Sequence, residues 1–289
     1  MRIRTGIVGL QSVFWPHAFA NCLNSISEAE LVACTSMGLD PNLISISLGK
    51  TPEEYAAQYD VRLYCDPTEM IQKEDLDAVC ICAKHTEIAN FVEQVAPLEV
   101  DIYIAKPMAT TLEAADRIVK AVRNHNLIAT SGTTERFDGG IREAYRRFKS
   151  GAIGELISIR ALHQHGDIGS FPKGDWYWDE EQGGPELSLV WYAADIVRWF
   201  ADSEVARVYA EYDNYLSENS PFMDNGKIIL KFENRVMGSI DIYFSVRGFQ
   251  FPYFEIELVG TTGAIRTQQS VYEGTLFTSD GVSLSLIHI

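Results

Sequence analysis

Residues 6–14 read GIVGLQSVF, and this stretch determines the expected fold of the first part of the chain. An apolar strand runs into a turn at Gly9, and Pro16 then suits the first turn of a helix, where its missing N–H is not needed. A strand, a glycine turn and a helix in this order are typical of nucleotide-binding α/β proteins. The usual fingerprint has two further glycines, and Gln11 and Phe14 stand in their places.

This turn can still bind a phosphate, because backbone N–H groups and a helix N-terminus carry partial positive charge whatever the side chains are. The alternative is a turn with a purely structural role. The residues expected to contact a nucleotide here are Gly9, Leu10, Gln11 and Ser12. After the second strand, Ser36 takes the position where an acidic residue normally bonds the adenosine ribose. No arginine follows to attract a 2′-phosphate, so the sequence leaves both NAD and NADP open as the cofactor.

Short apolar strands alternate with amphipathic helices up to about residue 130. The expected strands are Thr5–Leu10, Leu31–Thr35, Ala78–Cys82, Ile102–Ile104 and Leu127–Ser131. The expected helices are His17–Ile26, Pro52–Gln58, Thr86–Gln94 and Leu112–Asn124. Such alternation builds a parallel sheet covered by helices on both faces. We therefore predict an α/β Rossmann-type domain with a doubly wound parallel sheet over residues 1–130.

The pattern changes in the second part of the chain, where alternating apolar segments follow one another. The expected helices are Ile141–Lys149 and Leu187–Phe200, and the expected strands are Leu156–Leu162, Val205–Tyr212, Lys227–Phe232, Val236–Phe244 and Phe254–Val259. These segments predict an α+β domain with a large, mainly antiparallel sheet over residues 131–283.

The last six residues, 284–289, read LSLIHI, which CTG-TCT-CTT-ATA-CAC-ATC would encode. Because that DNA resembles a transposase-end sequencing adapter, we expect a non-native tail there.

Composition excludes several classes of partner. The 24 Lys and Arg residues against 40 Asp and Glu residues give a net charge of −16, which would repel nucleic-acid phosphates. No apolar run approaches the ~20 residues that span a bilayer, and the first residues lack the apolar core of a secretory signal. We expect a cytoplasmic protein without nucleic-acid or membrane partners.

Cys80 and Cys82 are expected to be free thiols on opposite faces of a buried strand, unable to share a metal.

Residues 102–108 read IYIAKPM, an apolar strand that leads directly into Lys106 and Pro107. The carboxyl end of such a strand borders the crevice in which open α/β sheets bind ligands. Pro107 fixes its own φ and biases Lys106 toward extended geometry, which would hold the ammonium in place. We expect both residues at the cofactor and Lys106 in catalysis; the alternative is a surface lysine. His85 is expected beside the nicotinamide or as a helix cap.

Several short motifs recur in an order and spacing that resemble a known family. They are His17-Ala18, Leu76–Val79, Ala105-Lys106-Pro107, Arg136-Phe137, Gly151–Glu155, Gly183-Gly184 ahead of Asp195, and Gly260–Gly263. From Ile3 to about Thr267 the chain resembles the Gfo/Idh/MocA family of NAD(P)-dependent oxidoreductases. The resemblance implies a Rossmann domain, hydride transfer between a nicotinamide and a carbon of a sugar or polyol, and a homo-oligomer formed through the C-terminal sheet.

The chain departs from the family pattern at the residues expected to move protons. Lys106 matches the family's lysine, but Ala105 replaces the acid of Glu-Lys-Pro, and Ser188 and Tyr192 stand where the family has an aspartate and a histidine. An active enzyme could use Tyr192 as proton acceptor, because a lysine ammonium nearby favours the phenolate. Ser188 would then orient the alcohol. The alternatives are a non-catalytic nucleotide-binding regulator or subunit, and NAD-dependent glycoside cleavage; Tyr192 could also be a core aromatic.

Two further groups of side chains precede the expected helix Leu187–Phe200. His163 and His165 share a face if both lie in a strand, so a two-histidine metal site is conceivable. The sequence identifies no third ligand for it. We instead expect His165 to border the substrate pocket as an auxiliary acid or base. Trp176 and Trp178 could stack on a sugar ring or pack between the domains. No metal is predicted.

Overall fold

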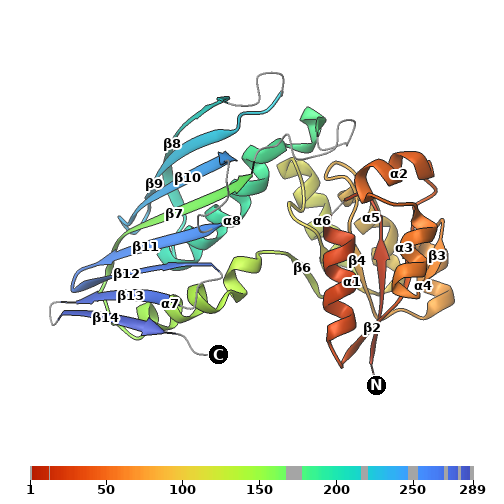
Figure 1. Cartoon of the computed structure of the whole chain (residues 1–289), viewed down its shortest axis with the longest axis horizontal. Coiled ribbons are helices and arrows are strands. Elements are labelled where there is room, and N and C mark those ends of the chain that lie inside the picture. Colours follow the sequence, from red (N-terminus) through yellow and green to blue (C-terminus); the bar gives the residue numbers. More distant parts are fainter. Residues whose placement is uncertain are drawn as a thin grey trace. The chain divides into compact units, whose positions relative to one another are not determined.

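The computed structural model describes residues 2–12, 14–166, 178–215, 221–246, 253–269, 273–278 and 281–286 (Figure 1). The described residues form two compact units. Unit 1 comprises residues 2–132 and 178–183, and unit 2 comprises residues 133–166 and the described residues from 184 onward. The chain therefore enters unit 1 a second time after it has begun unit 2.

Unit 1 is built around a six-stranded parallel sheet, sheet A, with the order β3-β2-β1-β4-β5-β6. Its strands are β1 (Ile3–Val8), β2 (Ala29–Thr35), β3 (Arg62–Tyr64), β4 (Ala78–Ile81), β5 (Asp101–Ile104) and β6 (Ala129–Ser131). Its α-helices are α1 (Trp15–Ser25), α2 (Pro41–Leu48), α3 (Pro52–Tyr59), α4 (Pro67–Glu74), α5 (Ile88–Val95) and α6 (Leu112–Asn124). The predicted doubly wound sheet is confirmed. Its winding reverses between β1 and β4, and ligands of such folds bind at the carboxyl ends of the strands there.

Three of these elements, α2, β3 and α4, were not expected from the sequence. Both helices have a proline in their first turn, preceded by an aspartate that caps the helix. Asp40 accepts a hydrogen bond from the Asn42 N–H at 2.8 Å, and Asp66 accepts one from the Glu69 N–H at 2.8 Å. Such caps satisfy N–H groups that have no partner within the helix. Strand β3 has only three residues and begins with an arginine, so it shows no apolar alternation.

Sheet A buries apolar side chains on both faces, as parallel sheets do. One cluster contains Val8, Ile81 and Ile104, and the other contains Ile7 together with the cysteines Cys34, Cys80 and Cys82. The expectation that Cys80 and Cys82 face opposite ways was wrong, because residues i and i+2 of a strand share a face. All five cysteines are free thiols. Burial raises the pKa of the Cys80 thiol to about 12, which keeps it protonated.

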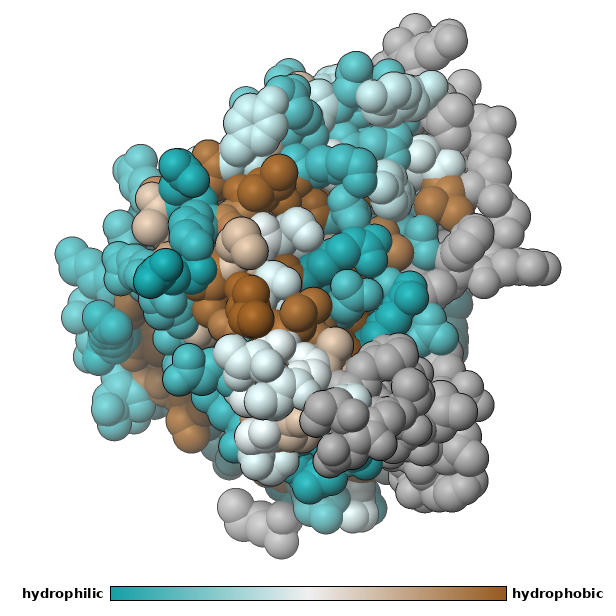
Figure 2. Space-filling view, turned by 90° about the vertical axis from the view of Figure 1, so that its left-hand side faces the viewer, coloured by the Kyte–Doolittle hydropathy of each residue, from teal (hydrophilic) through white to brown (hydrophobic). Residues whose placement is uncertain are grey.

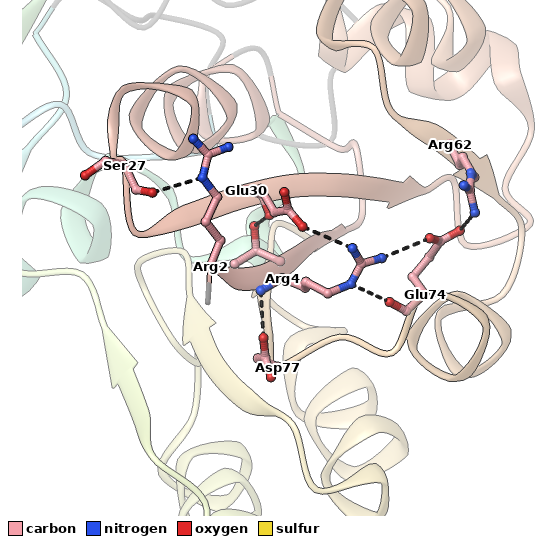
Figure 3. Close-up of polar contacts among 8 residues, drawn as sticks. Arg2, Arg4, Ser27, Glu30, Arg62, Glu74 and Asp77 are labelled. Atoms are coloured by element: carbon pink, nitrogen blue, oxygen red, sulfur yellow. Dashed lines mark hydrogen bonds and ion pairs between the residues drawn. The ribbon is translucent and has the colours of Figure 1, made fainter.

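Near the amino end of β1, the buried carboxylate of Glu74 joins α4 to the strands β1 and β3 (Figure 3). Glu74 accepts hydrogen bonds from Arg62 at 2.7 Å, from the Tyr64 hydroxyl, and from Arg4 at 3.5 Å. Arg4 also bonds Glu30 at 3.0 Å. Burial alone would raise the pKa of Glu74, but the hydrogen bonds from Tyr64 and Arg62 and the charges of both arginines outweigh it and hold that pKa below its usual value. Glu74 is therefore ionised in the folded protein.

Unit 2 is built on an eight-stranded sheet, sheet B, with the order β14-β13-β12-β11-β7-β10-β9-β8. Its strands are β7 (Leu156–Gly166), β8 (Val205–Asp213), β9 (Asn225–Phe232), β10 (Met237–Val246), β11 (Phe254–Gly260), β12 (Gly263–Gln268), β13 (Glu273–Thr278) and β14 (Gly281–Leu286). All neighbours are antiparallel except β7 and β10, which are parallel. The predicted mainly antiparallel sheet is confirmed. Residues 284–286 of the expected tail pair with β13.

Helices α7 (Gly139–Lys149) and α8 (Gly184–Ala201) pack on one face of sheet B (Figure 1). The opposite face, shown in Figure 2, combines hydrophobic side chains with hydrophilic ones. A row of alternating charges crosses five neighbouring strands on this face: Lys227, Asp241, Arg160, Glu255 and Arg266. The two carboxylates are 13% and 10% exposed, so the cations largely cover them.

Two of the motifs noted in the sequence contact each other in unit 2. Gly154 has φ +69°, and a Cβ there would lie 2.2 Å from the Thr261 hydroxyl. The Glu155 N–H donates to the same hydroxyl at 3.1 Å, and the Thr262 N–H donates to the Ile153 carbonyl at 3.0 Å. The glycine turn before β7 and the turn between β11 and β12 therefore fit together only with glycine at residue 154.

None of the helices in the described part of the chain combines the length and apolar character needed to cross a membrane. Within the same residues, no group of three or more His, Cys, Asp or Glu side chains is arranged to hold a metal ion.

Candidate functional site

The turn after β1 has the geometry that its first glycine requires. Gly9 has φ +91°, which L side chains rarely adopt, and a Cβ there would lie 2.9 Å from the carbonyl oxygen of Cys82. The Gly9 N–H donates to the Thr35 carbonyl at 3.2 Å, and the Gln11 N–H donates to that of Cys82 at 3.4 Å. The turn thus lies directly on the ends of β2 and β4, where only glycine fits.

The two residues that replace fingerprint glycines do not open a gap in this turn. Gln11 is buried, and its side-chain oxygen accepts a hydrogen bond from the Lys84 N–H at 3.1 Å, which tethers the turn to the loop after β4. Phe14 is 60% exposed and contacts Trp15 edge to face, so its ring does not separate α1 from the sheet. The Ser12 hydroxyl accepts hydrogen bonds from the N–H groups of Phe14 and Trp15 at 3.2 and 3.3 Å. Leu10 is fully buried.

Ser36 brings no carboxylate to the end of β2. Its N–H donates to the Tyr64 carbonyl at 2.9 Å, and its buried hydroxyl lies 3.5 Å from the same oxygen. Asp40, a little further along, accepts hydrogen bonds from both the N–H and the side-chain amide of Asn42. Because its carboxylate already caps α2, Asp40 is a poor substitute for the ribose-binding acid.

Lys106 follows β5 at the carboxyl edge of sheet A. The preceding Ala105 is buried, and its N–H donates to the Ile81 carbonyl at 2.9 Å. The Lys106–Pro107 peptide bond is cis. The Lys106 ammonium nitrogen lies over the indole of Trp15, 6.0 Å from the ring centroid. The lysine that follows this strand therefore faces an aromatic ring from the first turn of α1.

His85 lies after β4 and is buried. Its Nδ1 is 2.7 Å from the Gln182 carbonyl oxygen, so Nδ1 carries a proton and donates. Burial lowers the pKa of His85 to about 4, and the charge of Lys106 acts in the same direction, although the bond to Gln182 opposes it. His85 is therefore a neutral imidazole at physiological pH. It does not cap α5, whose N-cap is Glu87.

Gln182 fixes the segment 178–183 to the same loop of unit 1. Its side-chain oxygen accepts from the Thr86 N–H at 3.2 Å, and its side-chain nitrogen donates to the Thr86 hydroxyl at 3.0 Å. Gly183 follows with φ +81° and Gly184 with φ +50°, and α8 begins there. Three hydrogen bonds thus join residues 85 and 86 to a residue almost a hundred positions later.

In unit 2, helix α8 carries Ser188 and Tyr192, and both side chains are buried. The ring of Tyr192 contacts that of His163 from β7, edge to face at 5.2 Å. His163 is fully buried, and its Nδ1 donates to the Leu189 carbonyl of α8 at 2.9 Å. His163 also contacts Tyr253 at 4.7 Å. The sequence singled out His163 only as a conceivable metal ligand; its contact with Tyr192 depends on how α8 packs on β7, for which the sequence carries no signal.

His165 lies on the same face of β7 as His163. Its ring stacks on Phe244 at 4.9 Å and meets Tyr253 edge to face at 5.5 Å. Trp178 belongs to the segment that joins unit 1. Trp176 lies outside the described residues. Each unit thus presents its own set of predicted residues: Lys106, His85 and the Gly9 turn in unit 1, and Tyr192, Ser188 and His165 in unit 2.

Two family models match the chain over most of its length. Residues 3–133 match "Oxidoreductase family, NAD-binding Rossmann fold", and residues 141–266 match "GFO/IDH/MocA C-terminal domain". Among similar proteins is the myo-inositol 2-dehydrogenase of Thermotoga maritima, which is 24% identical over 282 residues, 96% of this chain and 78% of the relative. The scyllo-inositol 2-dehydrogenase (NAD(+)) of Bacillus subtilis is 24% identical over 274 residues, 91% of this chain and 73% of the relative.

Solved structures share the fold. An oxidoreductase from Agrobacterium radiobacter, crystallised with NAD+, L-tartaric acid and magnesium, superposes with a TM-score of 0.83 at 21% identity and covers 100% of this chain and 80% of its own. A myo-inositol 2-dehydrogenase from Lactobacillus plantarum gives 0.79 at 23% identity, over 98% of this chain and 82% of its own. Together with the two family models, these likenesses place the chain in the Gfo/Idh/MocA family of NAD-binding oxidoreductases.

Proposed function

We propose that this chain transfers a hydride between NAD(P) and a secondary alcohol of a polyol or sugar, as the inositol dehydrogenases similar to it are named for doing. The observation that carries the proposal is the placement of Lys106 at the carboxyl end of β5 in a sheet of the order β3-β2-β1-β4-β5-β6. Ligands of such sheets bind at that edge, where a lysine can contact a reacting oxygen.

The residues of unit 1 fit a dinucleotide. The Gly9 turn brings backbone against the end of β4, Gln11 tethers the turn to the loop after β4, and the exposed ring of Phe14 does not separate α1 from the sheet, although two fingerprint glycines are absent. We propose contacts with the cofactor from Gly9, Leu10, Gln11, Ser12, Ser36, His85, Lys106 and Pro107. Ser36 brings no repulsive carboxylate for a 2′-phosphate, so titration with NADH and NADPH distinguishes the two cofactors.

The bound nicotinamide supplies the carbon that accepts or donates the hydride. Lys106 would bind the alcohol oxygen through its ammonium and stabilise negative charge that develops there. We assign the proton-accepting role to Tyr192 as its phenolate, which becomes the phenol when it takes the alcohol proton, and an orienting hydrogen bond to the Ser188 hydroxyl. His165 is assigned an auxiliary role in proton transfer. The neutral state of His85 suits a neighbour of Lys106, because a second cation there would be repelled.

The proposal is tested by titrating the protein with NADH and NADPH and then assaying oxidation of myo-inositol, scyllo-inositol and a panel of aldoses. Lys106→Met is expected to reduce kcat by about 100-fold or more while nucleotide binding persists. Lys120→Met, the same change on the exposed surface of α6, is the matched control and should leave both unchanged. Turnover by Lys106→Met at the rate of the native protein would contradict the proposal.

A second candidate function is nucleotide binding without turnover, favoured by Ser188 and Tyr192 in place of the family's aspartate and histidine. It predicts saturable NADH binding together with no oxidation of any polyol or sugar. Nucleotide release on mixing with a polyol, without formation of NADH, would support it over the enzyme.

We also propose a homo-oligomer formed by the exposed face of sheet B (Figure 2). Large apolar side chains lie exposed on this face: Tyr209 of β8 opposite Ile229 of β9, Met237 on the adjacent β10, and Val259 on β11, beyond β7. A second copy of the chain would cover them, and the alternating charges of the row from Lys227 to Arg266 offer opposite signs to a partner of the same sequence. Light scattering should show a dimer or larger, and Ile229→Glu should shift it to monomer. A monomeric native protein at micromolar concentration would exclude the proposal.

A further inference from the structure

Lys106 lies at one end of a row of aromatic contacts in unit 1, and none of the assigned roles accounts for that row. The ammonium lies over the Trp15 indole, 6.0 Å from its centroid. Trp15 stacks on Phe19 at 5.5 Å with an interplanar angle of 30°, and Phe19 meets Tyr103 edge to face at 4.8 Å. Tyr103 belongs to β5, the strand that leads into Lys106. The aromatic row therefore runs from Trp15, which lies under the Lys106 ammonium, through Phe19 to Tyr103, which belongs to the strand that precedes Lys106.

The helical turn that carries Trp15 is also held in place. Trp15 is the first residue of α1, and the Tyr55 hydroxyl of α3 donates to the carbonyl oxygen of the next residue, Pro16, at 2.6 Å. One residue further, the ring nitrogen Nδ1 of His17 lies 2.9 Å from the Tyr59 hydroxyl. The first turn of α1 is thus fixed to α3 by two tyrosines. Because its ring stacks on Phe19 and its helical turn is bound to α3, the indole keeps its face toward the Lys106 ammonium.

We propose that Trp15 is a positioning residue for Lys106: its indole face holds the ammonium at the carboxyl edge of β5 and favours the charged form. The negative face of an indole attracts a cation without a carboxylate, and tryptophan is the strongest of the aromatic side chains in this respect. This chain has Ala105, buried and uncharged, where the resemblance expects an acid beside the lysine. The inference rests on the proposed catalytic role of Lys106, but the contact itself can be tested without turnover.

Two substitutions separate the aromatic face from the volume of the side chain. Trp15→Phe keeps an aromatic face at this position, and Trp15→Met fills the space with a flexible apolar chain that has none. Phe14→Met is the matched control, because Phe14 is the exposed neighbour that touches the edge of Trp15 and is not the ring beneath Lys106. Circular dichroism and thermal unfolding establish that each variant is folded.

The first readout is acetylation of Lys106 by limiting acetic anhydride at a fixed pH, followed by peptide mass spectrometry. Only the neutral amine reacts, so weaker stabilisation of the ammonium makes labelling faster. We expect acetylation of Lys106 to be about three- to tenfold faster in Trp15→Met than in the native protein, with a smaller increase in Trp15→Phe. Phe14→Met should label at the native rate. Equal labelling in the Met and Phe variants of Trp15 would overturn the inference.

The second readout uses turnover. Trp15→Met should lower kcat about three- to tenfold and leave the KM for NAD within about twofold. In a Lys106→Met background, the added Trp15→Met should cause no further loss, because a residue that acts through the lysine has nothing left to position. A further loss in that background would show that Trp15 acts on the cofactor directly and would overturn the inference. If no substrate turns over, the labelling experiment still decides it, so failure of the proposed function and failure of this inference are distinguishable.

Discussion

Arg136 donates two hydrogen bonds, of 2.5 and 2.6 Å, to the two carboxylate oxygens of Asp195, a residue 59 positions later in the chain. The guanidinium also lies over the ring of Trp199, 5.1 Å from its centroid. Both partners of this bidentate pair belong to motifs by which the chain resembles its family. The pair joins the 3₁₀ turn Thr134–Phe137 to α8, the helix that carries Ser188 and Tyr192. These two matching residues therefore position the helix with the candidate residues.

Replacing Arg136 by lysine should destabilise unit 2, because a lysine cannot form the two parallel hydrogen bonds of a guanidinium. We expect Arg136→Lys to lower the free energy of unfolding by about 1–2 kcal/mol. Arg146→Lys is the control, since Arg146 forms an exposed pair with Glu143 on one helix and should change stability by less than about 0.5 kcal/mol. Equal losses in urea unfolding of the two variants would contradict the structural role.

Gly9→Ala should impair nucleotide binding through both strain and crowding. The residue has φ +91°, and the new Cβ would lie 2.9 Å from the Cys82 carbonyl oxygen, so the turn must shift. We expect the Kd for NADH to rise about tenfold or more. Gly49→Ala is the matched control: that glycine has φ +79° with nothing within 4 Å of its Cβ position, so it isolates the effect of φ. Gly49→Ala should lower stability by about 1 kcal/mol and leave nucleotide affinity unchanged.

Glu74→Gln should lower stability at neutral pH and flatten its acid dependence. The pKa of Glu74 is depressed in the folded protein, so the carboxylate contributes stability above its unfolded pKa, and this contribution is lost as pH falls through the folded pKa. We expect a loss of about 2–3 kcal/mol near pH 7, because Arg62 and Arg4 lose their charged acceptor. The difference between native and variant should shrink below about pH 4. Glu69→Gln, which breaks only an exposed pair with Lys73, should show neither effect.

His85 should remain neutral well below the pH at which an ordinary histidine is protonated. Its pKa of about 4 in the folded protein lies below the usual value of 6.5, so the unfolded chain binds a proton that the folded chain does not. Its contribution to stability should be complete above about pH 6.5, decline between about pH 6.5 and 4, and change little below that. NMR titration should find one imidazole with a midpoint near 4 that disappears in His85→Gln. A midpoint near 6.5 would contradict the burial of the ring.

Tyr192→Phe tests the phenol of α8. If its phenolate accepts the alcohol proton, kcat should fall about 10²- to 10⁴-fold and the pH dependence of kcat should change shape. Affinity for NADH should stay within about twofold, because the candidate cofactor residues all belong to unit 1. Tyr145→Phe is the control: this tyrosine of α7 stacks on Trp199 and does not contact the His163 ring. An unchanged pH profile in Tyr192→Phe would remove Tyr192 from the mechanism.

The sequence predicted what depends on local patterns. The alternation of strands and helices predicted sheet A, and the strand ahead of Lys106 was identified from its apolar run. Elements without an apolar pattern were missed: β3 has three residues, and α2 and α4 are marked mainly by an aspartate and a proline. Contacts between distant segments could not be predicted at all. The bond from His85 to Gln182 spans 97 positions, and the edge of His163 against Tyr192 depends on how a helix packs on a strand.

Because residues 178–183 belong to unit 1, each unit is built from two separate segments of the chain. The chain belongs to unit 2 at Gly166, to unit 1 at Trp178 and to unit 2 again from Gly184. A fragment that ends at Gly132 would retain all six strands of sheet A yet lose the Gln182 groups that bond His85 and Thr86. No single cut can therefore release the nucleotide-binding unit intact, and exchange of one unit between relatives would require the exchange of this short segment as well.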